Sequence, residues 1–200
     1  MTHLGRRTFL TGSAAASAAT LLGGASFHSA RAAVADPAPI VLPPPIGRAE
    51  RLERLARART LMKRHGIGAI LIEPGASLDY FTGVQWWRSE RLTAAVIPAE
   101  GEPIVVTPFF EKPSVEESLA IPAEVRVWQE HEEPLKLVAD FLRERGVARQ
   151  PVGFEETNRF FILDRLKEQL PRAQIVSANP IVRSLRMIKS PAELALMQAA

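Results

Sequence analysis

The stretch that decides the fold runs from Gly68 to Pro108: Gly-Ala-Ile-Leu-Ile-Glu-Pro-Gly-Ala-Ser-Leu-Asp-Tyr-Phe-Thr-Gly, then Val-Gln-Trp-Trp-Arg-Ser-Glu-Arg, then Leu-Thr-Ala-Ala-Val-Ile-Pro-Ala-Glu-Gly-Glu-Pro-Ile-Val-Val-Thr-Pro. Two short apolar runs in it, 69–72 and 92–97, are typical of strands buried on both faces. The polar segment 98–103 predicts a tight reversal, and 104–107 predicts a returning strand. We therefore expect three strands joined by polar turns, the last two forming a β-hairpin.

Helices and strands are expected to alternate on both sides of this stretch. Apolar positions at helical spacing predict a helix from Ala49 to His65, which Gly66 ends. Downstream, the pattern predicts helices over 111–119, from Pro134 to before Gly146, and over 159–170, and strands over 125–128, 152–154 and 174–176. This alternation predicts an α/β fold with a mixed β-sheet flanked by helices.

A strong local signal lies near the end of the chain. Ser190-Pro191-Ala192-Glu193 combines an N-cap serine, a proline at the first helical position and a glutamate at the third, which is a complete capping box. The helix that it begins has no C-cap before Ala200. We therefore expect the 200 residues to be the front part of a longer protein.

Charge and composition exclude several classes of function. The chain has no cysteine, which excludes disulfides, thiolate metal sites and thiol nucleophiles. Residues 1–35 hold three arginines and no acid; without those three, the remaining 22 Lys and Arg equal the 22 Asp and Glu. The basic excess is thus confined to the leader, and we expect no nucleic-acid partner. The apolar run 9–25 is interrupted by Thr, Ser and Gly, so no stable membrane span is expected.

Residues 1–35 have the three parts of an export signal: a positive start, a modestly apolar middle and small-residue cleavage sites. Arg6 and Arg7, followed by Thr-Phe-Leu, resemble the twin-arginine signal, which predicts a periplasmic protein. Cleavage is expected after Ala32 or Ala35. A disordered Ala-rich tail is the alternative. The proline-rich residues 36–46 are expected to form an extended linker.

Two acidic groups are candidate chemical sites. His131-Glu132-Glu133 lacks a second histidine at helical spacing, so capping of the helix at Pro134 is favoured over metal binding. Glu155-Glu156 follows a strand, where a carboxylate pair suits acid–base chemistry. Capping of the helix near Arg159 is the favoured alternative for this pair.

The densest aromatic and charged cluster is Trp86-Trp87-Arg88-Ser89-Glu90-Arg91. Arginine offers a bidentate grip on a carboxylate and tryptophan offers a flat apolar wall, so the segment fits a binding lip. The equally weighted alternative is that one tryptophan belongs to the core and that Glu90 pairs with an arginine on the surface.

Several of these motifs resemble the creatinase/prolidase/Xaa-Pro aminopeptidase family. The Lys63-Arg-His-Gly66 helix end, the 69–72 strand, the Asp79-Tyr-Phe-Thr-Gly83 turn and Ser89-Glu-Arg91 are similar to its N-terminal domain. Residues 183–194, which include Arg186, Lys189, Ser190, Pro191 and Glu193, resemble its connector to the catalytic "pita-bread" domain. The resemblance implies an N-terminal domain over 47–180 and, over 181–200, the connector and first helix of the catalytic domain.

The resemblance assigns catalysis to residues outside this chain. It implies a pair of divalent metal ions (Mn, Zn or Co), bound only in the catalytic domain, so no catalytic or metal residue is expected here. It also implies a homodimer acting on proline-containing peptides, with Trp86, Trp87, Arg88, Glu90 and Arg91 as candidate substrate or dimer contacts. A creatinase-type C–N hydrolase and a stand-alone periplasmic binding module are the alternatives.

Overall fold

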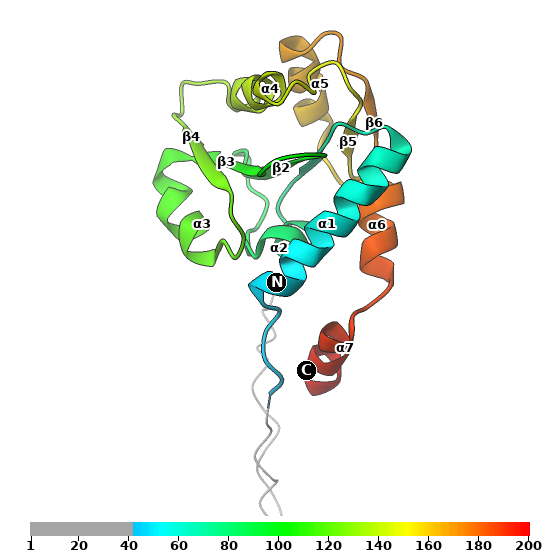
Figure 1. Cartoon of the computed structure of the whole chain (residues 1–200). Helices are drawn as coiled ribbons and strands as arrows, with labels where there is room; N and C mark the ends of the chain where they lie inside the picture. Colours follow the sequence, from blue (N-terminus) through cyan, green and yellow to red (C-terminus); the bar gives the residue numbers. More distant parts are fainter. Residues whose placement is uncertain (1–41) are drawn as a thin grey trace, which may run out of the picture. The chain divides into compact units, whose positions relative to one another are not determined.

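The computed structural model describes residues 42–200, which lie within one compact unit, Ile40–Ala200 (Figure 1). The predicted signal residues Arg6 and Arg7, the cleavage sites at Ala32 and Ala35, and the linker up to residue 41 lie outside the described residues.

Six strands form one mixed sheet in the order β4-β3-β2-β1-β5-β6. Their bounds are β1 (Ala69–Ile72), β2 (Ala94–Pro98), β3 (Ile104–Pro108), β4 (Glu124–Trp128), β5 (Val152–Phe154) and β6 (Ile175–Ser177). β2 runs antiparallel to both of its neighbours, β1 and β3, and the other three pairings are parallel. The predicted α/β class, the hairpin and the mixed sheet are confirmed.

Helices cover both faces of the sheet, as Figure 1 shows. On one face lie α1 (Arg48–His65), α2 (Ala76–Thr82), α3 (Lys112–Ser118) and α6 (Asn179–Met187), and on the other lie α4 (Pro134–Glu144) and α5 (Phe160–Gln169). A 3-10 turn, η1 (Phe109–Glu111), precedes α3, and α7 (Pro191–Ala199) follows α6.

The buried strand β1 joins the two cores. Its side chains alternate, so that Ala69 and Leu71 pack in the cluster with α4 and α5, while Ile70 and Ile72 pack in the cluster with α1, α2 and α6. All four residues are fully buried, as expected for a strand covered on both faces.

Two helices differ from the sequence-based expectation. Residues 79–83, expected to be a turn, are instead the end of α2, with Gly83 at the left-handed position that closes it. Helix α6 lies where only a connector was expected. α2 is seven residues long and half of it is apolar, so its hydrophobic period was too short to distinguish from a strand or a turn.

One edge of the sheet gathers the polar loops. Because β2 alone is reversed, β1, β3, β4, β5 and β6 all end at the edge where β2 begins. The loops 73–75, 109–111, 129–133 and 155–159 therefore meet the 84–93 segment there. Ligands of open α/β sheets bind beyond the carboxyl ends of the strands, so a binding site is expected at this edge.

Candidate functional site

The predicted lip, residues 86–91, forms the loop that leads into β2 at this edge. Trp87 is 92% exposed, whereas Trp86 packs against the core cluster that contains α1 and α2. Arg88 Nε donates to the Pro74 carbonyl oxygen at 3.2 Å, and its Nη2 donates to Thr157 Oγ1 at 2.9 Å. Arg88 is thereby fixed between the loops that follow β1 and β5.

The second half of the lip faces a different part of the sheet. Arg91 pairs with Glu130 at 2.7 Å and also contacts Glu90, while its guanidinium lies 5.6 Å from the centre of the Phe110 ring. Arg91 is therefore held near the loops that follow β3 and β4. The loop thus directs its two arginines toward opposite halves of the sheet and does not bring the five predicted side chains to one surface.

A cavity of about 560 Å³ opens at this edge beside Arg88. Its walls come from the ends of β1 and β5, from the start of α2 and from α6 with its following residues. They are lined by Glu73, Pro74, Gly75, Ala76, Ser77, Arg88, Glu155, Glu156, Thr157, Asn179, Arg183, Arg186, Met187 and Lys189.

A chain of hydrogen bonds connects three of the residues that line this cavity. Arg186 Nη1 donates to Ser77 Oγ at 2.8 Å, and Ser77 Oγ donates to Glu155 Oε1 at 2.6 Å. Burial raises the pKa of Glu155 above its usual value, although the Ser77 hydrogen bond and the charges of Arg186 and Arg88 oppose that rise. A carboxyl group with a raised pKa in a cavity has the electrostatics of a binding or acid–base site.

The expectation that Glu155-Glu156 cap the following helix is wrong. The backbone N–H of Arg159, the N-cap residue of α5, donates to Glu73 Oε2 at 2.7 Å instead, and Arg159 Nε donates to Glu73 Oε1 at 2.7 Å. Glu73 is buried and its partner Arg159 is 86 positions away, so the contact between them could not be predicted from neighbouring residues. Glu156 accepts a hydrogen bond from Asn179 Nδ2 at 2.9 Å.

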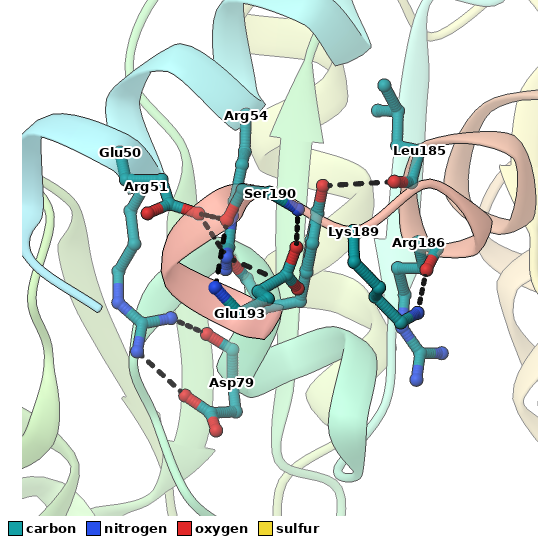
Figure 2. Close-up of polar contacts among 10 residues, drawn as sticks. Glu50, Arg51, Arg54, Asp79, Leu185, Arg186, Lys189, Ser190 and Glu193 are labelled. Atoms are coloured by element: carbon teal, nitrogen blue, oxygen red, sulfur yellow. Dashed lines mark hydrogen bonds and ion pairs between the residues drawn. The ribbon is translucent and has the colours of Figure 1, made fainter. Parts of the chain in front are cut away.

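A second polar cluster fastens the connector to α1, as Figure 2 shows. Arg54, whose side chain is 3% exposed, pairs with Glu50 at 2.6 Å and with Glu193 at 3.3 Å. It also donates to the Tyr80 carbonyl oxygen at 2.9 Å and lies over the Tyr80 ring. Ser190 Oγ donates to Glu50 at 2.8 Å, so helix α7 begins against α1.

The capping box at the start of α7 is confirmed and forms part of this cluster. The Glu193 backbone N–H donates to Ser190 Oγ at 3.1 Å, and the Ser190 N–H donates to Glu193 Oε2 at 2.8 Å. Burial alone would raise the pKa of Glu50, but hydrogen bonds from Ser190 and Arg54 outweigh it and lower that pKa. Sequence reasoning missed Arg54, although a charged residue beside Leu55 on the apolar face of α1 was an available signal.

The remaining acidic candidate is structural. Glu133 is the N-cap of α4 and accepts a hydrogen bond from the Leu135 backbone N–H at 3.1 Å, which confirms the capping interpretation of 131–133. Within residues 42–200, no three His, Cys, Asp or Glu side chains come together in a group that could hold a metal ion. None of the helices in that range is both long and apolar enough to cross a bilayer.

Comparison with protein families gives a match over most of the described residues. A family model described as the creatinase/prolidase N-terminal domain matches residues 54–188. The probable dipeptidase PepE of Mycobacterium tuberculosis is 32% identical over 149 residues, covering 74% of this chain and 39% of that protein. An ectoine hydrolase from Halomonas elongata is 27% identical over 167 residues, covering 78% of this chain and 42% of that protein.

Solved structures show the same architecture. The dipeptidase PepE from Mycobacterium ulcerans superposes with a TM-score of 0.65 at 32% identity, covering 74% of this chain and 40% of that chain. A prolidase from Thermococcus sibiricus also gives 0.65, at 23% identity and 39% of its chain, and supports the fold alone. The chain spans about two fifths of the length of the curated relatives it matches.

Proposed function

The chain belongs to the creatinase/prolidase N-terminal domain family, and from this premise we propose that it is the N-terminal, non-catalytic portion of an exported Xaa-Pro peptidase. In this proposal the domain supports dimerisation and shapes the substrate pocket, while a catalytic domain beyond the connector performs hydrolysis. The observation that carries the proposal is the family match, which covers residues 54–188 and ends within the connector.

The described residues do not fit the metal pair implied by the family. Residues 42–200 offer no group of His, Asp or Glu side chains for a metal ion, so no step of a reaction is assigned to a metal in this domain. In the proposal, the Mn, Zn or Co pair belongs to the catalytic domain.

The contact role is proposed for the exposed part of the lip. Trp87 presents its indole to solvent at the edge where five strands end, and Arg88 lies beside it. Large exposed aromatic side chains are enriched in protein contacts, where they add area at a small entropic cost. In the dimer, we expect Trp87 and Arg88 to reach the substrate or the neighbouring subunit.

The test uses the full-length enzyme and the substitutions Trp87→Ala and Arg88→Ala. Each should raise KM for a Xaa-Pro dipeptide about tenfold, or weaken the dimer in sedimentation experiments, because each removes contact area or charge. Leu52→Ala, an exposed apolar residue on α1, is the matched control. Unchanged KM and unchanged dimer affinity in both variants would contradict the contact role.

One relative favours a second candidate function. The ectoine hydrolase named above acts, by its name, on a substrate other than a Xaa-Pro peptide, and it matches a larger share of this chain than the PepE protein does. The alternative is therefore a C–N hydrolase of the creatinase type. Assays of the full-length enzyme with a Xaa-Pro dipeptide, ectoine and creatine distinguish the two.

Export is proposed from the leader alone. Arg6 and Arg7 would direct the folded protein through the twin-arginine route, with cleavage after Ala32 or Ala35. Replacing both arginines by lysine should retain the precursor in the cytoplasm. N-terminal sequencing of the periplasmic protein should begin at residue 33 or 36, and a start before Ala30 would contradict the proposal.

A further inference from the structure

We propose that the cavity between the ends of β1 and β5 binds a free amino acid as a zwitterion, whose carboxylate meets Arg88, Arg186 and Lys189 and whose ammonium group meets Glu155 and Glu156. This site lies wholly within the described domain and does not rest on the proposed function.

The cationic side of the cavity has charge available for a ligand. Arg88 donates to a carbonyl and a threonine hydroxyl, and Arg186 donates to the Ser77 hydroxyl, so the hydrogen-bond acceptors of both arginines are neutral groups. Lys189 Nζ donates to the Arg186 carbonyl oxygen, which is also neutral. Among residues 42–200 none of these three forms an ion pair with a carboxylate.

Other arginines of the domain behave differently. Arg126 pairs with two glutamates, at 2.9 Å and 2.6 Å, and Arg159 pairs with Glu73 at 2.7 Å. Cations that line a cavity without a direct ion pair are suited to an incoming carboxylate, which a guanidinium can bind with two hydrogen bonds.

The same cavity carries an acidic side. Of its three glutamates, Glu73 is neutralised by Arg159, whereas Glu155 accepts a bond from a serine and Glu156 one from an asparagine. Arg183 lies 3.7 Å from Glu156, a distance too long for a strong hydrogen bond. The carboxylates therefore have lone pairs free for an ammonium group, which a ligand such as phosphate does not offer.

The cationic and the acidic side chains of the cavity are held in place before a ligand binds. Arg88 is anchored at Pro74 and Thr157, and the Arg186–Ser77–Glu155 chain connects α6, α2 and the end of β5. Side chains fixed in advance lose less entropy on binding. The cavity volume of about 560 Å³ lies within the range of small-molecule sites.

The test titrates the purified 200-residue chain with L-alanine and follows the backbone amide signals of Gly75, Ala76 and Ser77 by NMR. Alaninamide lacks the carboxylate, and N-acetylalanine lacks the ammonium group. None of the three compounds contains a peptide bond between amino acids, so none is a substrate for the peptidase activity of the proposed function. We expect saturable shifts with L-alanine and at least tenfold weaker binding of both analogues and of inorganic phosphate.

The variants assign the effect to the cavity. Arg186→Met and Lys189→Gln should each raise the Kd for L-alanine about tenfold, and Lys189→Gln leaves the Ser77 hydrogen bond intact. Arg149→Met, an exposed arginine away from this cavity, is the matched control. Absence of saturable shifts, or equal affinity in Lys189→Gln and the control, would overturn the proposal. Phosphate or N-acetylalanine binding as tightly as L-alanine would overturn it in favour of a plain anion site.

Discussion

At the scale of single residues, Arg54 is the buried cation that pairs with Glu50 of α1 and with Glu193 of α7, as Figure 2 shows. Arg54→Met should lower the free energy of unfolding by about 3 kcal/mol, because it leaves Glu50 and Glu193 without their buried partner. Urea unfolding measures the loss. Arg57→Met, an exposed arginine of the same helix, should stay within about 0.5 kcal/mol of the unchanged chain, and equal losses in both would refute the buried-cluster interpretation.

Glu155 should make stability depend on pH. Since burial raises its pKa in the folded state, its favourable contribution is complete below the pKa of the unfolded chain and is lost as the pH rises through the folded pKa. Glu155→Gln cannot ionise, so it should be the more stable form at about pH 8, by up to about 1 kcal/mol, and should gain nothing at about pH 4.

Thermal unfolding across this pH range measures the difference for Glu155→Gln. The control is Glu156→Gln, which removes an exposed charge from the same cavity. A gain that is the same at acidic and basic pH would count against a titrating Glu155.

At the scale of elements, the end of α2 is fixed by a glycine. Gly83 has φ +86°, and a Cβ there would lie 2.7 Å from the Ala120 Cβ and 3.0 Å from the Ser118 carbonyl oxygen. Gly83→Ala should therefore cost about 3 kcal/mol, the sum of a left-handed backbone penalty and a clash with backbone. Gly66→Ala, at φ +65° with nothing within 4 Å, should cost only about 1 kcal/mol. If chemical unfolding gave the same loss of unfolding free energy for both variants, a steric clash at Gly83 would be excluded.

The elements most accurately predicted from the sequence were those with strong local signals. Neighbouring residues alone determine three of them: the strand 152–154, the end of α1 at Gly66 and the capping box at Ser190. α2 lacked that information because it is short. α6 did carry a local signal, a proline in its first turn and apolar residues at 181, 182 and 185, but the family resemblance assigns this segment to the connector.

The candidate site was predicted only in part, for a different reason. Arg88 and Glu155 were named as candidates, but the cavity that joins them depends on contacts over long separations. Arg186 and Ser77 are 109 positions apart, and Arg88 and Thr157 are 69 apart. Periodicity and motif spacing report on neighbours along the chain, so they do not determine which loops meet at the sheet edge.

At the scale of the whole described domain, Ser190 joins the last helix to the first. Ser190→Ala removes both the N-cap oxygen and the donor to Glu50 and should cost about 1 kcal/mol, confined to α7. Hydrogen exchange of residues 191–199 should accelerate about fivefold while the sheet amides keep their protection. Ser190→Thr retains both functions of the hydroxyl and should behave like the unchanged chain; loss of protection in β1 would contradict a local effect.

The Glu50–Arg54–Ser190–Glu193 cluster also determines how the domain responds to mechanical force. The chain enters at α1 and leaves through Ser190, and these two points are hydrogen-bonded to each other. Tension applied to the two ends would therefore act first across this small polar contact. The force would reach the strands only after the contact had broken. Stretching should accordingly proceed in two stages: detachment of α7 at low force, with little extension, and then tearing of the sheet.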